Sequence, residues 1–221
     1  MTALLVEAKA RLEIVRYSAA MWDRGWVANH DGNLSARVGA NRVVCTPTAT
    51  SKSDVTDSLL VVTDAGGKQI AGRRKAPGEF GIHLAAYRAR ADVSAVLHAH
   101  PPYATALGVS GRELVCFLPE AIVSLGTKVP LVPLAAPGGP AVSAIEPFFS
   151  PYDAVIVTAN GVWAWGDSVE QAFLRIELVE HLARIAHEAS AWGGPQPLPQ
   201  EMVTQLLEAR KKAFPRLAAA K

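Results

Sequence analysis

Two histidines separated by one residue are the side chains in this sequence best suited to chemistry. His98 and His100 close the apolar run Val-Leu-His-Ala-His, which favours a strand over residues 95–100. Side chains two positions apart on a strand point to the same face, so both imidazoles can reach one ion. Imidazole binds zinc and other late first-row metals, and carboxylates often complete such sites. Because histidine pairs at strand ends are also common at surfaces and in turns, the spacing alone leaves the metal site open.

The elements around this pair indicate one α/β domain in which helices and short strands alternate along the chain. Helices are predicted for residues 2–24, 79–90, 101–107, 168–190 and 201–214, from apolar residues at helical spacing or from proline in a first turn. Strands are predicted for residues 34–38, 42–46, 59–63, 95–100, 129–134, 154–158 and 162–165. Residues 137–140, Pro-Gly-Gly-Pro, are expected to break the chain. Without an internal repeat or a central linker, the pattern predicts a single domain over residues 1–221.

Composition excludes several classes of protein. Half of the 221 residues are apolar, 19% are charged and the net charge is +2, which is ordinary for a soluble globular protein. Basic residues are scattered, so we expect no nucleic-acid partner. No apolar run is long enough to span a membrane, and the first residues lack a signal-peptide pattern. Cys45 and Cys116 have no metal-type spacing, which favours reduced thiols in a cytoplasmic protein.

Several motifs around the histidine pair follow the order found in a known family. They read GNLSAR at residues 32–37, TPT at 46–48, EFGIHLAAY at 79–87, ADVSAVLHAHPPYATAL at 91–107 and GVWAWG at 161–166. Together they resemble the signature of the class II aldolase/adducin family over most of the chain. The resemblance implies a three-layer α/β/α sandwich around a mixed, mainly antiparallel sheet. It also implies a small-molecule substrate, a divalent metal ion and a homo-oligomer, commonly a tetramer with sites between subunits.

The resemblance assigns roles to three residues and puts one expected ligand in question. His98 and His100 match two of the family's three metal histidines, and Glu79 matches an acidic residue that serves as acid or base and can approach the metal. The third histidine position holds Asn160, whose amide is a weak oxygen ligand for zinc. By itself, a glutamate at the position of Glu79 is equally well explained by the helix dipole.

Three interpretations of the Asn160 position remain open. The amide coordinates a harder metal such as Mn²⁺ or Mg²⁺, or a carboxylate from Glu79 or Glu120 completes a set of two histidines and one carboxylate. Alternatively, the metal site has degenerated, as in the non-enzymatic adducin branch. We favour the carboxylate. Zinc is the first expectation for the metal, with Mn, Fe or Co as alternatives.

Glu120 is the second carboxylate that we single out. A glutamate here resembles the acid or base of the methylthioribulose-phosphate dehydratase branch, and two carboxylates in different surroundings can divide the two roles. The alternative is a surface or helix-capping side chain after Pro119. His83, His181 and His187 fall on helical segments and are expected to be structural or exposed, while Trp163 and Trp165 are expected to pack in the core.

The substrate loops differ from those of the sugar-phosphate members. The residues expected to bind substrate are Gly32, Asn33, Thr48, Ala49, Gly78 and Asn160. Thr48-Ala49 lacks the glycine that the family carries, and Pro77-Gly78 replaces a pair of serines, so phosphate meets fewer hydroxyl and N–H groups.

Two compensations for the altered loops are conceivable. Asn33, Thr48 and Lys52 could restore phosphate binding, or an unphosphorylated hydroxy or keto acid could be met by the basic residues 73–75. The sequence as a whole predicts a metal-dependent lyase, an aldolase or decarboxylase, that acts on a small hydroxy-carbonyl compound through a metal-stabilised enediolate. An epimerase or dehydratase acting on a sugar phosphate is the first alternative. A catalytically silent, adducin-like binding protein is the second.

Overall fold

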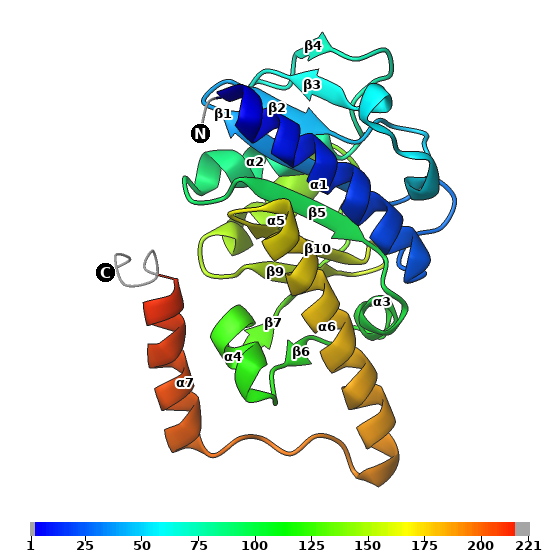
Figure 1. Cartoon of the computed structure of the whole chain (residues 1–221). Helices are drawn as coiled ribbons and strands as arrows, with labels where there is room; N and C mark the ends of the chain where they lie inside the picture. The colour runs from blue at the N-terminus through cyan, green and yellow to red at the C-terminus, as the bar shows by residue number, and fades with distance from the viewer. Residues whose placement is uncertain (1–2, 215–221) are drawn as a thin grey trace.

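An eight-stranded sheet forms the middle layer of the computed structural model, which describes residues 3–214. Its strand order is β4-β3-β2-β1-β5-β10-β9-β8 (Figure 1). Neighbouring strands are antiparallel except β8 and β9, which are parallel. The strands are β1 (Asn33–Gly39), β2 (Arg42–Cys45), β3 (Val61–Thr63), β4 (Gln69–Ala71), β5 (Ala95–Ala99), β8 (Leu131–Val132), β9 (Ala154–Val157) and β10 (Val162–Gly166). The mixed, mainly antiparallel sheet of the prediction is confirmed.

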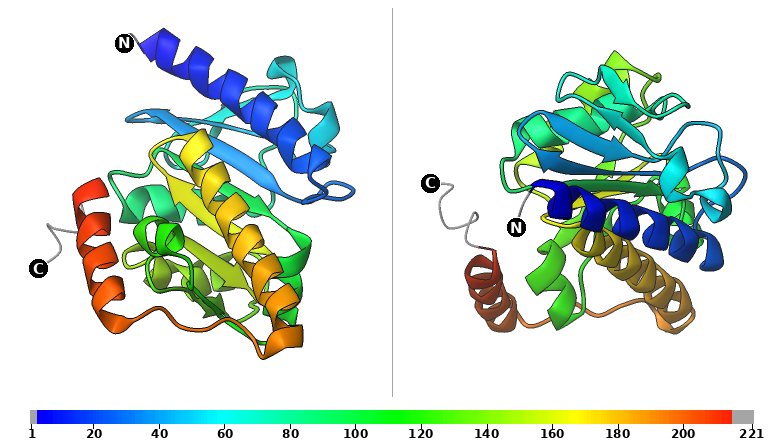
Figure 2. Two further views of the ribbon diagram at one scale, coloured as in Figure 1. Left: turned by 60° about the horizontal axis from the view of Figure 1, so that its bottom comes forward. Right: turned by 45° about the horizontal axis from the view of Figure 1, so that its top comes forward.

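Helices cover both faces of this sheet. On one face lie α1 (Ala3–Asp23), α3 (Pro102–Val109) and α6 (Val169–Ala189), and on the other lie α2 (Phe80–Ala89) and α5 (Gly139–Phe149) (Figure 2). Because both faces are covered, the central strands β5, β9 and β10 are buried along their whole length. Such strands are mostly apolar, as observed here apart from His98 of β5, and the three layers confirm the predicted α/β/α sandwich.

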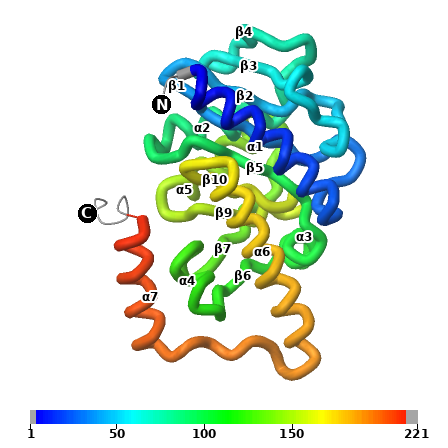
Figure 3. The backbone as a smooth tube through the Cα atoms, in the orientation of Figure 1, coloured from blue at the N-terminus to red at the C-terminus, as the bar shows by residue number. Residues whose placement is uncertain are grey.

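A smaller layer packs beside the main sheet. Strands β6 (Leu114–Val115) and β7 (Lys128–Val129) pair with each other, and α4 (Pro119–Leu125) lies between them along the chain. After α6 an extended linker leads to α7 (Gln200–Ala213), which packs against α4 (Figure 3). Arg210 of α7 donates to the Val123 carbonyl and to the buried carboxylate of Asp153, so α7 is anchored to the core. No helix among residues 3–214 is long and apolar enough to cross a membrane.

Two predicted strands are wrong in detail for physical reasons, and the break predicted at residues 137–140 leads directly into a helix. The strand expected at residues 129–134 is divided at Pro130, which has no N–H for a ladder, into β7 and β8 of two different sheets. The strand expected at 59–63 begins only at Val61, because Asp57–Leu59 forms a 3-10 turn. The break at residues 137–140 is also the start of a helix: Gly138 takes φ 88° and Pro140 occupies the first turn of α5.

Candidate active site

One row of side chains crosses three neighbouring strands at the ends that meet the loops. The register pairs Asn33 of β1 with His98 of β5, and pairs His98 in turn with Trp163 of β10. Residues directly opposite each other in a sheet share a face, so all three side chains point toward α2. Glu79 is the residue immediately before α2, and its side chain makes no capping bond to that helix. The carboxylate is therefore available to the row below it.

The two histidines are held in defined orientations. His98 is buried and lies flat on the Trp163 indole, with ring centroids 4.2 Å apart and an interplanar angle of 11°. Its Nδ1 lies 3.1 Å from the Val162 carbonyl, which can only accept, so Nδ1 carries the proton. His100 Nδ1 lies 3.1 Å from Asp31 Oδ2 in the same way. In both rings this arrangement leaves Nε2 as the atom with a free lone pair.

The two Nε2 atoms face each other at 3.1 Å. Two free lone pairs repel at that distance unless a proton or a cation lies between them. Two ligands of one tetrahedral zinc ion, each at about 2.0–2.1 Å, stand about 3.3 Å apart. A second hydrogen bond from each ligating histidine to a carbonyl or a carboxylate is the usual support of such a ring. The histidine pair therefore fits a divalent metal ion.

The third protein ligand is not in place. No group of three or more His, Cys, Asp or Glu side chains in the described part of the chain is arranged to hold a metal ion. Glu79 Oε2 lies 3.4 Å from His98 Nε2, and Glu79 is thus adjacent to the histidine pair. Burial lowers the pKa of His98 to about 4, although the Glu79 carboxylate acts in the opposite direction. A neutral imidazole at ordinary pH is the form that binds metal.

Glu79 is clamped by two amides. Asn160 Nδ2 donates to Oε1 at 2.8 Å and Asn33 Nδ2 donates to Oε2 at 3.2 Å. Burial opposes ionisation of the carboxyl, but the neighbouring His98 and the two amide donors together hold the pKa of Glu79 below its usual value. Asn160 therefore presents its N–H groups to Glu79, and in this arrangement it stabilises a carboxylate instead of offering an oxygen to a metal.

A tight approach of the late hairpin brings Asn160 to this position. Gly161 has φ 66°, and a Cβ on it would lie 2.3 Å from the Ala99 carbonyl oxygen and 2.4 Å from His100 Cδ2. No residue with a side chain fits there, so glycine is required for β10 to follow β5 this closely.

A cavity of about 270 Å³ opens over the histidine pair. All of the substrate-binding residues expected from the sequence line it, namely Gly32, Asn33, Thr48, Ala49, Gly78 and Asn160, together with Glu79, His98 and His100. The backbone at Ala49 is left-handed, with φ 51°, although this position holds alanine and not glycine. Asp31, which was not predicted as a site residue, also lines the cavity. In the sequence, only its place in the turn before Gly32 indicated that it could lie there.

The structure does not bring the other expected groups to this cavity. Glu120 is exposed on α4 and is not part of the cavity lining of its own chain. Lys52 is buried beside the loop, where its Nζ donates to the Thr50 carbonyl at 2.7 Å. Arg74 donates to the Ala49 carbonyl and to Thr50 Oγ1. No lysine or arginine among the described residues lines the cavity, and Arg74 instead holds the loop that does.

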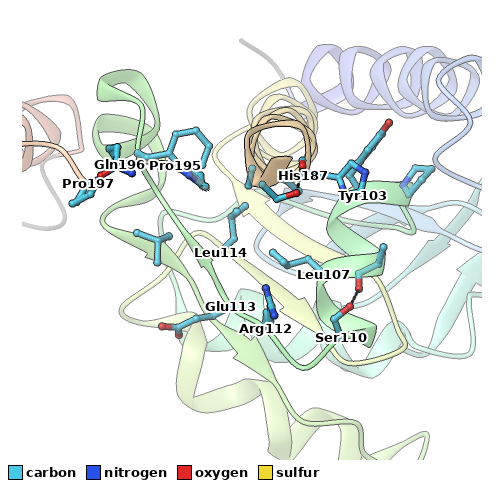
Figure 4. A pocket seen from close by; sticks show the side chains of 18 residues that line it. Tyr103, Leu107, Ser110, Arg112, Glu113, Leu114, His187, Pro195, Gln196 and Pro197 are labelled. Carbon is cyan, nitrogen blue, oxygen red and sulfur yellow. Dashed lines mark hydrogen bonds between the residues drawn. The ribbon is translucent and has the colours of Figure 1, made fainter. Parts of the chain in front are cut away.

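A second, larger hollow lies between α3, β6, the end of α6 and the linker that follows it. Its volume is about 930 Å³, and its lining is mostly apolar, including Leu107, Leu114 and Pro195 (Figure 4). Arg112, Glu113, His187 and Tyr103 provide its few charged or titratable side chains. We call this hollow the apolar groove and the hollow over the histidines the polar cavity.

Known proteins resemble this chain in both sequence and fold. The model of the family "Class II Aldolase and Adducin N-terminal domain" matches residues 12–187. The chain belongs to this family. It is 30% identical to an L-fuculose phosphate aldolase of Methanococcus vannielii over 79% of this chain and 94% of that protein. It is also 30% identical to a methylthioribulose-1-phosphate dehydratase of Methylococcus capsulatus, over 77% and 89% of the two chains.

Two further similarities bear on the reaction and on the fold of this class II aldolase family member. A 3-oxo-tetronate 4-phosphate decarboxylase of Pectobacterium atrosepticum is 28% identical over 83% of this chain and 86% of that protein. The solved structure of an L-fuculose 1-phosphate aldolase superposes with a TM-score of 0.84 at 25% identity, covering 93% of this chain and 97% of that one. The predicted family, fold and lyase-type enzyme are confirmed.

Family membership also supplies coarser statements about the cofactor and the partners. Members act on small molecules, depend on a divalent metal ion and are often oligomers. Which metal this chain uses, how many subunits it assembles and which residues do the chemistry remain predictions.

Proposed function

We propose that this chain is a divalent-metal-dependent lyase that breaks a carbon–carbon bond beside the oxygens of a small hydroxy-carbonyl compound. The observation that carries the proposal is the position of Glu79. Its carboxylate is held by two amides and lies 3.4 Å from an imidazole nitrogen whose lone pair is free. A base beside a cation site is the arrangement that carbanion chemistry requires.

The residues of the polar cavity have three roles, which are metal binding, proton transfer and orientation of the carboxylate. His98 and His100 would hold the ion through Nε2, with Glu79 as the third protein ligand or as the base beside it. When bound, the ion supplies polarisation of the substrate's carbonyl and hydroxyl oxygens and stabilises negative charge next to them. In a retro-aldol cleavage, Glu79 would take up the proton of the substrate hydroxyl as the carbon–carbon bond breaks, and would return it to the carbon that keeps the electron pair. Asn33 and Asn160 orient the carboxylate that does this.

Zinc remains our first expectation for the metal, and the carboxylate remains our choice for the third ligand. This choice is supported by Asn160, which donates N–H to Glu79 at 2.8 Å and so has its amide nitrogen, not its oxygen, toward the carboxylate. Two histidines and one carboxylate also suit Fe²⁺, Mn²⁺ and Co²⁺.

The substrate's anionic end meets a cavity that no lysine or arginine of residues 3–214 lines. An anion there would be bound by the Asn33 amide, the Thr48 hydroxyl and main-chain N–H groups, which carry partial charges only. The three relatives act, by their names, on different phosphorylated compounds at nearly equal identity. We propose a sugar phosphate or a hydroxy or keto acid, with cleavage or decarboxylation preferred over dehydration and epimerisation.

The experiment that tests this function couples metal analysis with product analysis. We expect stoichiometric divalent metal in the purified protein, loss of metal and of activity in His98→Ala, and two product fragments, or CO₂, by NMR. An exposed histidine on α6 gives the control: His181→Ala should keep both metal and activity. Full activity in exhaustively chelated protein would overturn the proposal, and a product of unchanged mass would select the epimerase instead.

A homo-oligomer, with a tetramer as the first expectation, gives the exposed Glu120 a place to act. We propose that Glu120 serves the polar cavity of a neighbouring subunit, because it is absent from the cavity of its own chain. Glu79→Gln and Glu120→Gln should each be impaired, whereas refolded mixtures of the two should recover activity from hybrid interfaces. Mixtures no more active than the separate variants, or a monomer by sedimentation, would contradict this assignment.

A further inference from the structure

A buried chain of hydrogen bonds leads from α2 and β1 to the acid–base carboxylate. Tyr87 Oη lies 2.6 Å from Ser35 Oγ, and Ser35 Oγ lies 2.7 Å from His83 Nδ1. His83 Nε2 lies 2.6 Å from Asn33 Oδ1, and Asn33 Nδ2 donates to Glu79 Oε2 at 3.2 Å. All of these residues except Glu79 are buried. None of the roles proposed above involves Ser35, His83 or Tyr87.

Each hydrogen bond from Tyr87 to Asn33 has a defined donor and acceptor. Complete burial lowers the pKa of His83 to about 3, so the ring is neutral and carries one proton. Asn33 Oδ1 can only accept, so that proton lies on Nε2 and Nδ1 has a free lone pair. Ser35 must then donate its only proton to Nδ1. Because the Ser35 proton is used, Tyr87 donates to Ser35.

The same logic fixes the Asn33 amide. An amide can rotate by 180° and exchange its oxygen with its nitrogen at little intrinsic cost. Here the rotated amide would place Oδ1 against the Glu79 carboxylate, so two acceptors would face each other. It would also require the His83 proton to move to Nδ1, and Ser35 would then have to donate to Tyr87 instead of accepting from it. The pairing of Asn33 with its strand neighbour His98 keeps the backbone in place. Only the side-chain orientation is left for His83 to decide.

The ring of His83 has little freedom to move. The Phe80 ring lies against it with centroids 5.7 Å apart, and the Trp163 ring makes a T-shaped contact with centroids 5.4 Å apart. The Trp163 ring is the one on which His98 stacks. His83 is therefore fixed by the same aromatic residue that orients the metal-binding imidazole, and it reaches Glu79 only through Asn33.

We propose that His83 is a positioning residue that, with Ser35 and Tyr87 behind it, locks the Asn33 amide so that its N–H meets Glu79. The inference deepens the proposed function, on which its kinetic consequence rests. It assigns to a buried histidine, for which the sequence indicated packing or exposure, the task of keeping the Glu79 carboxylate aligned. Partners one step behind a reacting group commonly change activity about 10–100-fold when removed.

Kinetic variants test the consequence. His83→Phe keeps an aromatic ring and removes both nitrogens, and we expect kcat to fall about 10–100-fold while metal content and KM stay close to those of the parent. His83→Gln keeps an N–H donor and should recover part of the loss. Ser35→Ala and Tyr87→Phe remove single hydroxyls and should give smaller losses in that order. The control is His181→Phe on the exposed face of α6, which should leave kcat unchanged.

A purely structural role would give a different pattern. It would lower the yield and stability of folded protein, and the kcat of the folded fraction would match the parent for every variant of His83, Ser35 and Tyr87. That result overturns the proposal. If His83→Phe does not fold, the comparison of Ser35→Ala and Tyr87→Phe with the parent decides between the same two outcomes.

A measurement that needs no substrate separates this inference from the proposed reaction. Neutron diffraction of the deuterium-exchanged, otherwise unmodified protein should show deuterium on His83 Nε2 and none on Nδ1, with the Asn33 ND₂ group toward Glu79. Deuterium on Nδ1, or a rotated Asn33 amide, overturns the positioning role of His83 even if the protein is an active lyase. The expected pattern in a protein without lyase activity supports the positioning role and refutes the proposed function.

Discussion

The polar cavity and the apolar groove differ in almost every respect. The groove encloses about 930 Å³ and the cavity about 270 Å³, so size alone would select the groove as the ligand site. Yet the side chains with free lone pairs, a depressed carboxyl pKa and buried hydrogen-bond partners gather at the small cavity. In the groove, the Glu113 carboxylate forms an exposed ion pair with Lys128. Converging polar side chains therefore mark the chemistry here better than volume does.

The largest contrast should come from removing one negative charge in each hollow. Glu79→Gln keeps the shape of the side chain but removes the base, so kcat should fall about 10²–10⁴-fold. The matched change in the groove, Glu113→Gln, breaks a pair in which both side chains are about 40% exposed, and kcat should stay within about twofold. Steady-state kinetics of both variants measure the contrast. Equal losses would show that the groove takes part in the reaction.

A metal ligand can be added to each hollow in the same manner. Asn160→His restores an imidazole beside the histidine pair, and metal affinity should rise by about 10–100-fold, a change that competition with a chelator measures. The activity should not rise in parallel, because Glu79 loses the 2.8 Å hydrogen bond from the Asn160 amide. Gln196→His places the same imidazole in the lining of the groove and should not change metal affinity. Unchanged affinity in Asn160→His would mean that the third position is filled from elsewhere.

The sequence predicted the atoms of the polar cavity better than their arrangement. His98 and His100 follow from spacing within one strand, and the family motifs add Glu79 and the loop residues. Trp163 and Asn33 become partners of His98 only through a register that joins strands about 65 residues apart in the chain. The hydrogen bond from His83 to Asn33 likewise spans 50 positions. No periodicity within a segment carries that information.

The apolar groove could not be predicted from the sequence for a related reason. Its walls come from α3, β6, the end of α6 and the linker, and β6 is two residues long. An element that short has no pattern to recognise, and its partner β7 was merged with β8 across Pro130. The main layers were predictable because long helices and buried strands repeat their apolar residues, whereas short elements depend on what they pack against.

The smallest contrast concerns charges beside the two hollows. Burial lowers the pKa of Lys52, which supports the cavity loop, to about 8, against the attraction of Asp31. In the unfolded chain the group titrates near 10.4, so below pH 8 it is charged in both states and the folded state carries the desolvation cost. That cost disappears as the pH rises from 8 to above 10. Lys52→Met should therefore raise the free energy of unfolding by roughly 1–3 kcal/mol at pH 7 and by clearly less at pH 9.5, measured by urea denaturation. Lys128→Met, at the exposed pair beside the groove, should show no such pH-dependent gain, and an equal gain for Lys52→Met at both pH values would mean that Lys52 keeps its ordinary pKa.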